Sequence, residues 1–191
     1  MALGKYDWSE HYGWVTDKFG LTWQIMLQES EIITPITPCL LFTKNHFGKA
    51  EKALNLYTSL FQNSSIDTCQ RYPAGPLEWK ILYSECTLDG SRLILMDGPG
   101  THEFAFNEAV SLVVDCVDQA EVDHFWNGLT ADEGEESQCG WLKDAAGVSW
   151  QIVPKALGES MSRDTSGNVM KAMLGMKKLI VSELEAACNG Q

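Results

Sequence analysis

The chain has 191 residues, of which 45% are hydrophobic, so it is long enough to bury a core of its own. Its 26 acidic residues outnumber 14 basic ones, which gives a formal charge of −12 at pH 7. A nucleic-acid-binding surface needs clustered lysine and arginine, so nucleic acid is not expected as a partner. No apolar run approaches the roughly 20 residues of a membrane span, and no basic, apolar leader is present. We therefore expect a cytoplasmic protein that does not bind membranes.

The first half of the chain is predicted to form a strand, a helix and three more strands. Two prolines keep residues 32–42 extended, and this apolar run is the predicted first strand. A helix is predicted over 48–61, because apolar side chains recur there at helical spacing: Ala50, Ala53, Leu54, Tyr57, Leu60 and Phe61. Strands follow at 65–72, 80–88 and 92–96, with the turn-forming pair Asp89-Gly90 between the last two.

The same order of elements then restarts. A strand is predicted at 109–116, and Asp118 is placed to cap a helix over 119–129. Strands at 137–143 and 148–153 complete a second β-α-β-β-β module, and the chain after Pro154 is predicted to be helical. The predicted fold is therefore α+β. Two paired βαβββ modules enclose a cavity with their helices outside, preceded by an N-terminal β-hairpin and followed by C-terminal helices.

One segment of fourteen residues occurs twice. Residues 12–25 and 139–152 align without a gap at a constant offset of 127, and seven of the fourteen positions are identical. Each copy is predicted to be a hairpin with strands of about 11–16 and 21–27 in the first copy, around an Asp-x-x-Gly turn. The second copy closes a domain at 31–155, so that 1–30 resembles the end of another copy and 156–191 is a helical tail. Two explanations stay open: descent from a longer two-domain protein, or a hairpin kept for pairing or dimer contacts.

Four strings carry a specific family resemblance: I-T-P-C-L-L-F, A-E-K-A-L-N-L-Y-T-S-L-F, F-N-E-A-V-S-L-V-V and C-G-W-L-K-D-x-x-G-V-S-W-Q-I-V-P. In this order they closely resemble the PhnB-like family, over about residues 31–185. That family belongs to the vicinal oxygen chelate superfamily, with glyoxalases, extradiol dioxygenases and bleomycin-resistance proteins. Its members are often labelled 3-demethylubiquinone-9 3-methyltransferase. The resemblance implies paired βαβββ modules and a homodimer, and it implies no securely known reaction.

The resemblance also implies where a metal would bind. Enzymes of the superfamily commonly hold a divalent metal with His, Glu or Gln from the module strands. At the corresponding positions this chain has Gln151, Ser111 and either Thr37 or Pro38, so no metal cofactor is expected. His102 is the one histidine that directly follows a module strand and could face the cavity with Asp97. His102, Asp97 and Gln151 are thus the weak candidates for a divalent metal site.

Two other chemistries find little support in the residues. A methyltransferase needs a site for S-adenosylmethionine, and no glycine-rich turn after a strand is followed by an acidic residue on the next strand. Cys139 and His102 have the side chains of a nucleophile and a base, but no third group that would orient them is evident.

Bulky aromatic residues and sparse polar ones favour a small-molecule pocket between the modules. Two functions stay open: a small-molecule-binding homodimer, or a metal-dependent lyase, isomerase or dioxygenase of the vicinal oxygen chelate type. The missing His and Glu ligands favour binding, and a ubiquinone-pathway methyltransferase is the third hypothesis. The residues expected to contact a ligand are Gln151, Trp141, Cys139, Asp97, His102, Phe104 and Trp126.

Overall fold

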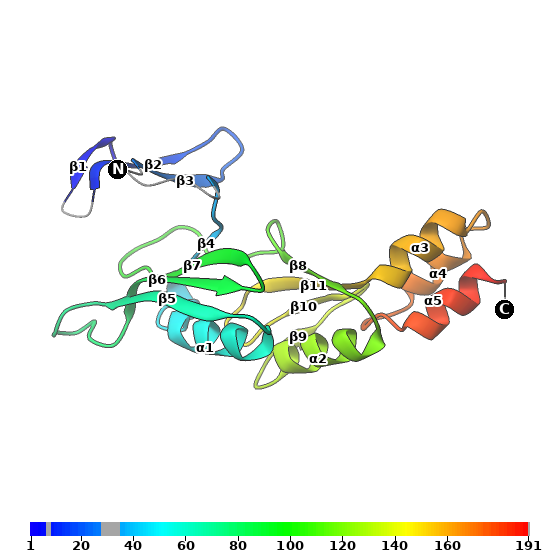
Figure 1. The fold of residues 1–191 in the computed structure, drawn as a ribbon. Coiled ribbons are helices and arrows are strands. Elements are labelled where there is room, and N and C mark those ends of the chain that lie inside the picture. The colour runs from blue at the N-terminus through cyan, green and yellow to red at the C-terminus, as the bar shows by residue number, and fades with distance from the viewer. Residues whose placement is uncertain (7–8, 28–34, 191) are drawn as a thin grey trace. The chain divides into compact units, whose positions relative to one another are not determined.

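The computed structural model describes residues 1–6, 9–27 and 35–190 (Figure 1). The chain divides into two compact units, Met1–Thr37 and Pro38–Gln191. The predicted beginning of the first strand, at residues 32–34, lies outside the described residues. In the described part of the chain, no helix is long and apolar enough to cross a membrane.

The N-terminal unit is a three-stranded antiparallel sheet. Its strands β1 (Gly4–Tyr6), β2 (Ser9–Thr16) and β3 (Thr22–Met26) are arranged in chain order. Strands β2 and β3 confirm the predicted hairpin, in which Trp14 lies opposite Gln24. Strand β1 was not predicted, and it pairs with the other edge of β2.

The first module of the second unit has the predicted order of elements. Its elements are β4 (Cys39–Phe42), the short 3₁₀-helix η1 (Lys44–His46), α1 (Ala50–Leu60), β5 (Ser65–Arg71), β6 (Ile81–Leu88) and β7 (Ser91–Asp97). The sheet order is β4-β7-β6-β5, with β4 parallel to β7 and the other pairs antiparallel. Asp89 and Gly90 both have positive φ, at 44° and 82°, as a tight hairpin turn requires.

The second module repeats this topology. Its elements are β8 (Leu112–Cys116), α2 (Gln119–Thr130), β9 (Glu135–Glu136), β10 (Trp141–Lys143) and β11 (Ser149–Pro154), in the sheet order β8-β11-β10-β9. Asp118 caps α2 as predicted, accepting a hydrogen bond from the Glu121 amide at 3.0 Å.

The predicted strand at 137–143 is wrong in its first four residues. Cys139 and Gly140 have left-handed φ values of 60° and 84°, which end the extended conformation. Their amides donate to the carbonyl groups of Met176 and Lys177, at 2.8 and 2.7 Å. The C-terminal tail therefore shortens β10 by drawing these two amides away from the sheet.

The tail is helical, as predicted, and has a small core of its own. It consists of α3 (Lys155–Arg163), α4 (Asn168–Leu174) and α5 (Val181–Cys188). The buried apolar residues of this core are Val169, Met176, Leu179 and Leu184. The side chain of Gln119, at the start of α2, accepts a hydrogen bond from the Val181 amide at 2.8 Å, which ties the tail to the second module.

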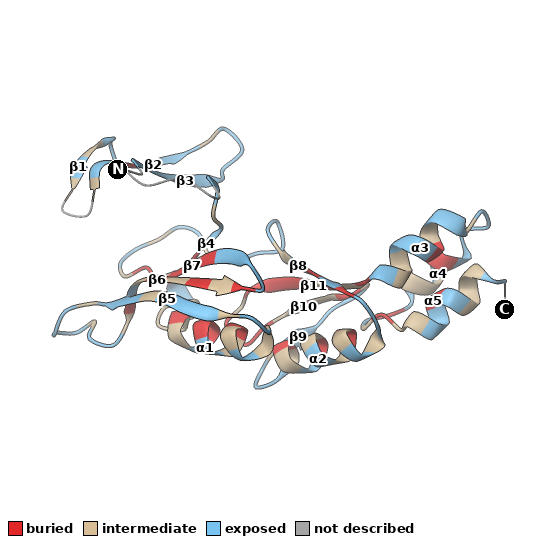
Figure 2. Ribbon diagram, viewed as in Figure 1, coloured by how far each residue is buried: buried red, intermediate tan, exposed pale blue. Residues whose placement is uncertain are grey.

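Helices α1 and α2 lie on the same side of the two sheets (Figure 1), and one core cluster extends beneath both (Figure 2). Helix α1 contributes its predicted apolar face, with Ala50, Ala53, Leu54 and Tyr57 buried. The opposite side of the second sheet faces away from α2. We call it the outer face, and it carries Val113, Trp141, Lys143, Ser149 and Gln151.

A buried carboxylate joins the second hairpin to helix α1. Asp144 Oδ1 accepts hydrogen bonds from the amides of Ala146 and Val148, at 2.9 and 3.0 Å. Its Oδ2 accepts from the Tyr57 hydroxyl at 2.6 Å and from Trp150 Nε1 at 2.9 Å. Burial, followed by the Asp144 charge, raises the pKa of Tyr57 well above its usual value, so this phenol remains a donor at neutral pH.

Replacing Tyr57→Phe removes one donor from this carboxylate and keeps the ring. We expect the free energy of unfolding to fall by about 1.5–3 kcal/mol, the usual contribution of a hydrogen bond to a charged group. Urea denaturation measures the loss. The matched control is Tyr72→Phe, which loses a bond to the backbone oxygen of Asp97 (3.1 Å) and should cost only about 0.5–1.5 kcal/mol. Equal losses in the two variants would contradict the special role of Asp144.

The Asp144 turn requires a glycine at position 147 for two reasons. Gly147 has a φ of 92°, and a Cβ there would overlap the His46 ring. Gly147→Ala should therefore lose about 1–2 kcal/mol from the backbone and about 1–3 kcal/mol from the overlap. In the repeat, Gly20 has a similar φ of 89° and no atom within 4 Å of a Cβ. Gly20→Ala should leave the thermal midpoint of the second unit unchanged, and an equally mild Gly147→Ala would refute the packing argument.

The burial of His46 also makes the free energy of unfolding depend on pH. Burial, and then the nearby Lys49 charge, lowers the pKa of His46, so the folded protein holds this ring neutral. Its contribution to stability is complete above the unfolded histidine pKa of about 6.5 and is lost as the pH falls below that value. Urea midpoints should drop between about pH 7.5 and about pH 5.5, and His46→Gln should reduce the drop. This prediction is wrong if His46→Gln loses as much stability as the parent over this pH range.

Candidate functional site

The outer face of the second sheet contains a hollow of about 430 Å³. Its walls come from β9, β10, the first residue of β11, the turn at 137–139 and Glu108. Cross-strand pairs set which side chains reach it: Lys143 lies opposite Ser149, and Trp141 lies opposite Gln151. Because side chains alternate along a strand, the intervening Leu142 and Trp150 point into the core instead.

Ser149 is the least satisfied polar residue of this hollow. It is 2% exposed, and its Oγ has no hydrogen-bond partner among the described residues. The neighbouring polar side chains are engaged: Lys143 forms an ion pair with Glu108, and Gln151 Nε2 donates to Ser111 Oγ at 2.8 Å. A buried hydroxyl without a partner costs about 1–3 kcal/mol in desolvation, so a ligand that bonds to it regains stability.

Acidic residues outnumber the single Lys143 in the walls. Glu108 forms an ion pair with Lys143 and Glu135 lies opposite it, whereas Glu136 lies opposite the core-facing Leu142 and forms an ion pair with Lys177. A hydrogen bond from Lys143 lowers the pKa of Glu108. The indole N–H of Trp126, at 2.9 Å, is the main cause that lowers the pKa of Glu136. Both carboxyls are therefore ionised at neutral pH, and the hollow disfavours anions.

Two of the predicted ligand contacts line this hollow, and a third lies beside it. Trp141 is half-buried in the wall, and Cys139 lies in the adjacent turn. Gln151 is the cross-strand neighbour of Trp141 on the same face. Trp126 is placed differently, because its ring is fully buried in the core and only its indole N–H reaches the wall, at Glu136.

Asp97 lies on the helix side of the first sheet. Its carboxylate is buried and accepts hydrogen bonds from the amides of Gly48 at 2.7 Å, Ala50 at 3.3 Å and Ile81 at 2.9 Å. These bonds join the end of β7 to the first turn of α1 and to β6. Asp97 therefore faces away from the outer face on which Gln151 lies.

His102 and Phe104 lie together in the loop after β7, with ring centroids 5.2 Å apart. The His102 ring covers Gly98, since a Cβ there would come within 3.1 Å of its Nε2. Among the described residues, His102 makes no hydrogen bond to Gln151 or to Cys139. Among these same residues, no group of three or more His, Cys, Asp and Glu side chains is placed to hold a metal ion.

Sequence reasoning did not single out Ser149, Lys143 and Glu108. Alternation along 148–152 already indicated that Ser149 and Gln151 share a polar strand face. Only the pairing of β10 with β11 shows that Lys143 lies opposite Ser149. The ion pair to Glu108 links segments 35 residues apart, and no local pattern predicts such a contact.

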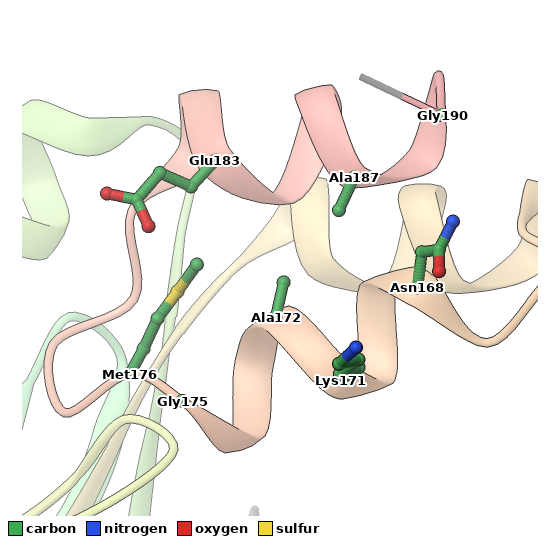
Figure 3. Close-up of a pocket in the computed structure, with 8 residues that line it drawn as sticks. All are labelled: Asn168, Lys171, Ala172, Gly175, Met176, Glu183, Ala187 and Gly190. Atoms are coloured by element: carbon green, nitrogen blue, oxygen red, sulfur yellow. The ribbon is translucent and has the colours of Figure 1, made fainter.

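A second hollow, of about 480 Å³, lies between α4 and α5 in the tail (Figure 3). Figure 3 shows Lys171 and Glu183 well apart, with Ala172 between them. No polar residue of its lining is buried, in contrast to Ser149. The outer-face hollow is therefore the better candidate site.

Comparisons with known proteins identify the family. The model of the family described as 3-demethylubiquinone-9 3-methyltransferase matches residues 34–153. A Bacillus cereus PhnB protein with the same methyltransferase label is 36% identical, with a TM-score of 0.58 over 63% of this chain and 99% of its own. Protein PA1353 from Pseudomonas aeruginosa is 18% identical, with a TM-score of 0.54 over 62% and 96% of the two chains.

A fosfomycin resistance protein, FosX from Mesorhizobium loti, is 11% identical, with a TM-score of 0.46 over 70% of this chain and 100% of its own. A search of the curated proteins found no match. The family match covers both βαβββ modules and none of the tail after β11. The chain therefore belongs to the family described as 3-demethylubiquinone-9 3-methyltransferase, the PhnB-like proteins of the vicinal oxygen chelate superfamily.

Proposed function

We propose that this chain binds a small molecule in the hollow on the outer face of its second module. The observation that carries the proposal is the buried Ser149 hydroxyl, which has no partner in the described part of the chain. Native proteins rarely leave such a group unbonded, and a ligand atom at hydrogen-bond distance would satisfy it. The proposal includes the homodimer and the cytoplasmic location expected above, and it assigns no role to a metal.

The walls indicate the chemical class of the ligand. Trp141 offers a flat apolar surface and, to a cation, the negative face of its indole ring. Ser149 Oγ can accept a hydrogen bond from an ammonium group or donate one to a neutral oxygen. On the outer face, Glu108 and Glu135 against Lys143 leave an excess of negative charge, which disfavours anions. The expected ligand thus has a flat apolar part and a neutral or positively charged polar end.

Ser149→Ala should separate binding from folding. Because the buried Ser149 Oγ has no described partner, its loss should not lower the free energy of unfolding and should raise it by up to about 1–3 kcal/mol. The matched control is Ser84→Ala, since the equally buried Ser84 Oγ donates to the Leu95 carbonyl at 2.9 Å. That variant should lose about 1 kcal/mol. A large loss of stability in Ser149→Ala would show that its hydroxyl is already bonded.

Binding is tested with three probes of one shape, namely phenethylamine, 2-phenylethanol and 3-phenylpropionate, by isothermal titration calorimetry. The amine should bind best and the carboxylate worst, and Ser149→Ala and Trp141→Ala should each weaken the amine by about tenfold. Trp79→Ala, which removes an exposed tryptophan of the first module, is the control and should not change affinity. Equal binding by all three variants would refute this site, and preference for the carboxylate would refute the ligand class.

A further inference from the structure

The two copies of the repeated hairpin have the same internal hydrogen bonds. Asp17 Oδ1 accepts from the amides of Phe19 and Leu21 at 2.8 and 3.1 Å, and its Oδ2 accepts from Trp23 Nε1 at 3.0 Å. Asp144 makes the three equivalent bonds, at 2.9, 3.0 and 2.9 Å. The N-terminal hairpin therefore already has the local conformation of a hairpin that closes a module.

The two hairpins differ in what covers them. Trp150 and Ile152 of the second hairpin are 2% and 0% exposed, under α1 and α2. Their counterparts Trp23 and Ile25 are 37% and 54% exposed. Leu21 is 48% exposed, against 4% for its counterpart Val148. The N-terminal sheet thus presents to solvent the face that a module buries in its core.

The N-terminal sheet also lacks the two contacts that complete the second hairpin. Strand β11 pairs with the parallel strand β8, whereas β3 is an edge strand among the described residues. Asp144 Oδ2 accepts a second bond from Tyr57 of α1, whereas Asp17 Oδ2 has Trp23 as its described donor. The missing group is therefore a parallel strand together with a helix that offers a hydroxyl donor.

A second copy of this chain does not supply that group. Its α1 and β8 are already paired with its own second hairpin. Moreover, the turn of the N-terminal hairpin has Lys18 and Phe19 where the second hairpin has the buried residues Ala145 and Ala146. The larger side chains need a recess that the first module of this chain lacks.

We propose that the N-terminal sheet, Gly4–Met26, docks onto a partner chain built of βαβββ modules that lacks its last hairpin. The partner contributes a strand parallel to β3, a helix with a hydroxyl donor for Asp17, and a recess for Phe19. The apolar face of Val15, Leu21, Trp23 and Ile25 becomes the core of the completed module. Docking of this kind supplies a missing pair of strands to a sheet edge and a core face together.

The first test asks whether the N-terminal sequence can close a module. In the full chain, the second hairpin receives the sequence of the first one except at the turn, through Cys139→Tyr, Leu142→Val, Lys143→Thr, Val148→Leu and Ser149→Thr. This graft should unfold cooperatively, and Tyr57→Phe should lower its midpoint as much as in the parent. Adding Ala146→Phe to the graft should abolish cooperative unfolding. A graft without cooperative unfolding overturns the proposal.

The second test measures docking between chains. The probe is a tagged fragment of residues 38–138, which keeps α1 and β8 but lacks the closing hairpin, co-expressed with the full chain. Lys18→Ala/Phe19→Ala in the full chain removes the mismatch with this probe and should allow recovery of a one-to-one complex. Adding Trp23→Asp should reduce recovery at least tenfold. As a control, the fragment is also combined with separately expressed residues 139–191. Recovery of the fragment with residues 139–191, but not with the Lys18→Ala/Phe19→Ala chain, overturns the proposal.

Discussion

The architecture of the second unit depends on a carboxylate that has been removed from water. A buried, unpaired carboxylate is strongly unfavourable, so Asp144 is tolerated only because four donors surround it. Two of these donors are amides of its own turn, one is the indole of Trp150, and one is the phenol of Tyr57. The first three form whenever the hairpin forms. The fourth requires that the helix of the first module lie against the hairpin of the second, so Asp144 couples the two modules.

A second buried carboxylate, that of Asp97, accepts hydrogen bonds at the other end of the same helix. Asp97 accepts amides of Gly48 and Ala50 at the start of α1, where unpaired N–H groups and the positive end of the helix dipole favour an anion. Helix α1 is thus attached near its N-terminus to its own sheet and, at Tyr57, to the neighbouring module. Both carboxylates stabilise the fold through hydrogen bonds on the helix side of the sheets. The side chains that remain for ligand chemistry are those of the outer face.

Sequence patterns predicted the elements better than the site, for a physical reason. The spacing of Ala50, Ala53, Leu54 and Tyr57 and the pair Asp89-Gly90 encode short-range geometry, and the structure confirms both. A site depends on which face a residue occupies and on what lies across from it. Asp97 was a candidate ligand because it ends a strand, yet it shares the phase of the buried Leu93 and Leu95. The residue type of Asp97 suggested that it faces a cavity, whereas the alternation of side chains along the strand places it on the helix side of the sheet.

The repeated hairpin distinguishes, within one chain, what the local sequence determines from what distant residues determine. Seven shared residues are enough to reproduce the Asp-x-x-Gly turn and the bond from indole to carboxylate in both copies, whether the hairpin is covered or exposed. Burial, by contrast, comes from residues far away in the chain, namely α1, α2 and β8 for the second copy. A sequence that retains Trp23, Ile25 and Asp17 on an exposed face therefore keeps the features of a core-forming surface. Nothing within the hairpin itself needs that surface, because its strands and turn are already hydrogen-bonded. Among the described residues one edge of β3 is unpaired, and the second hairpin, whose β11 pairs with β8 and packs against α1 and α2, shows which kind of segment completes such a hairpin.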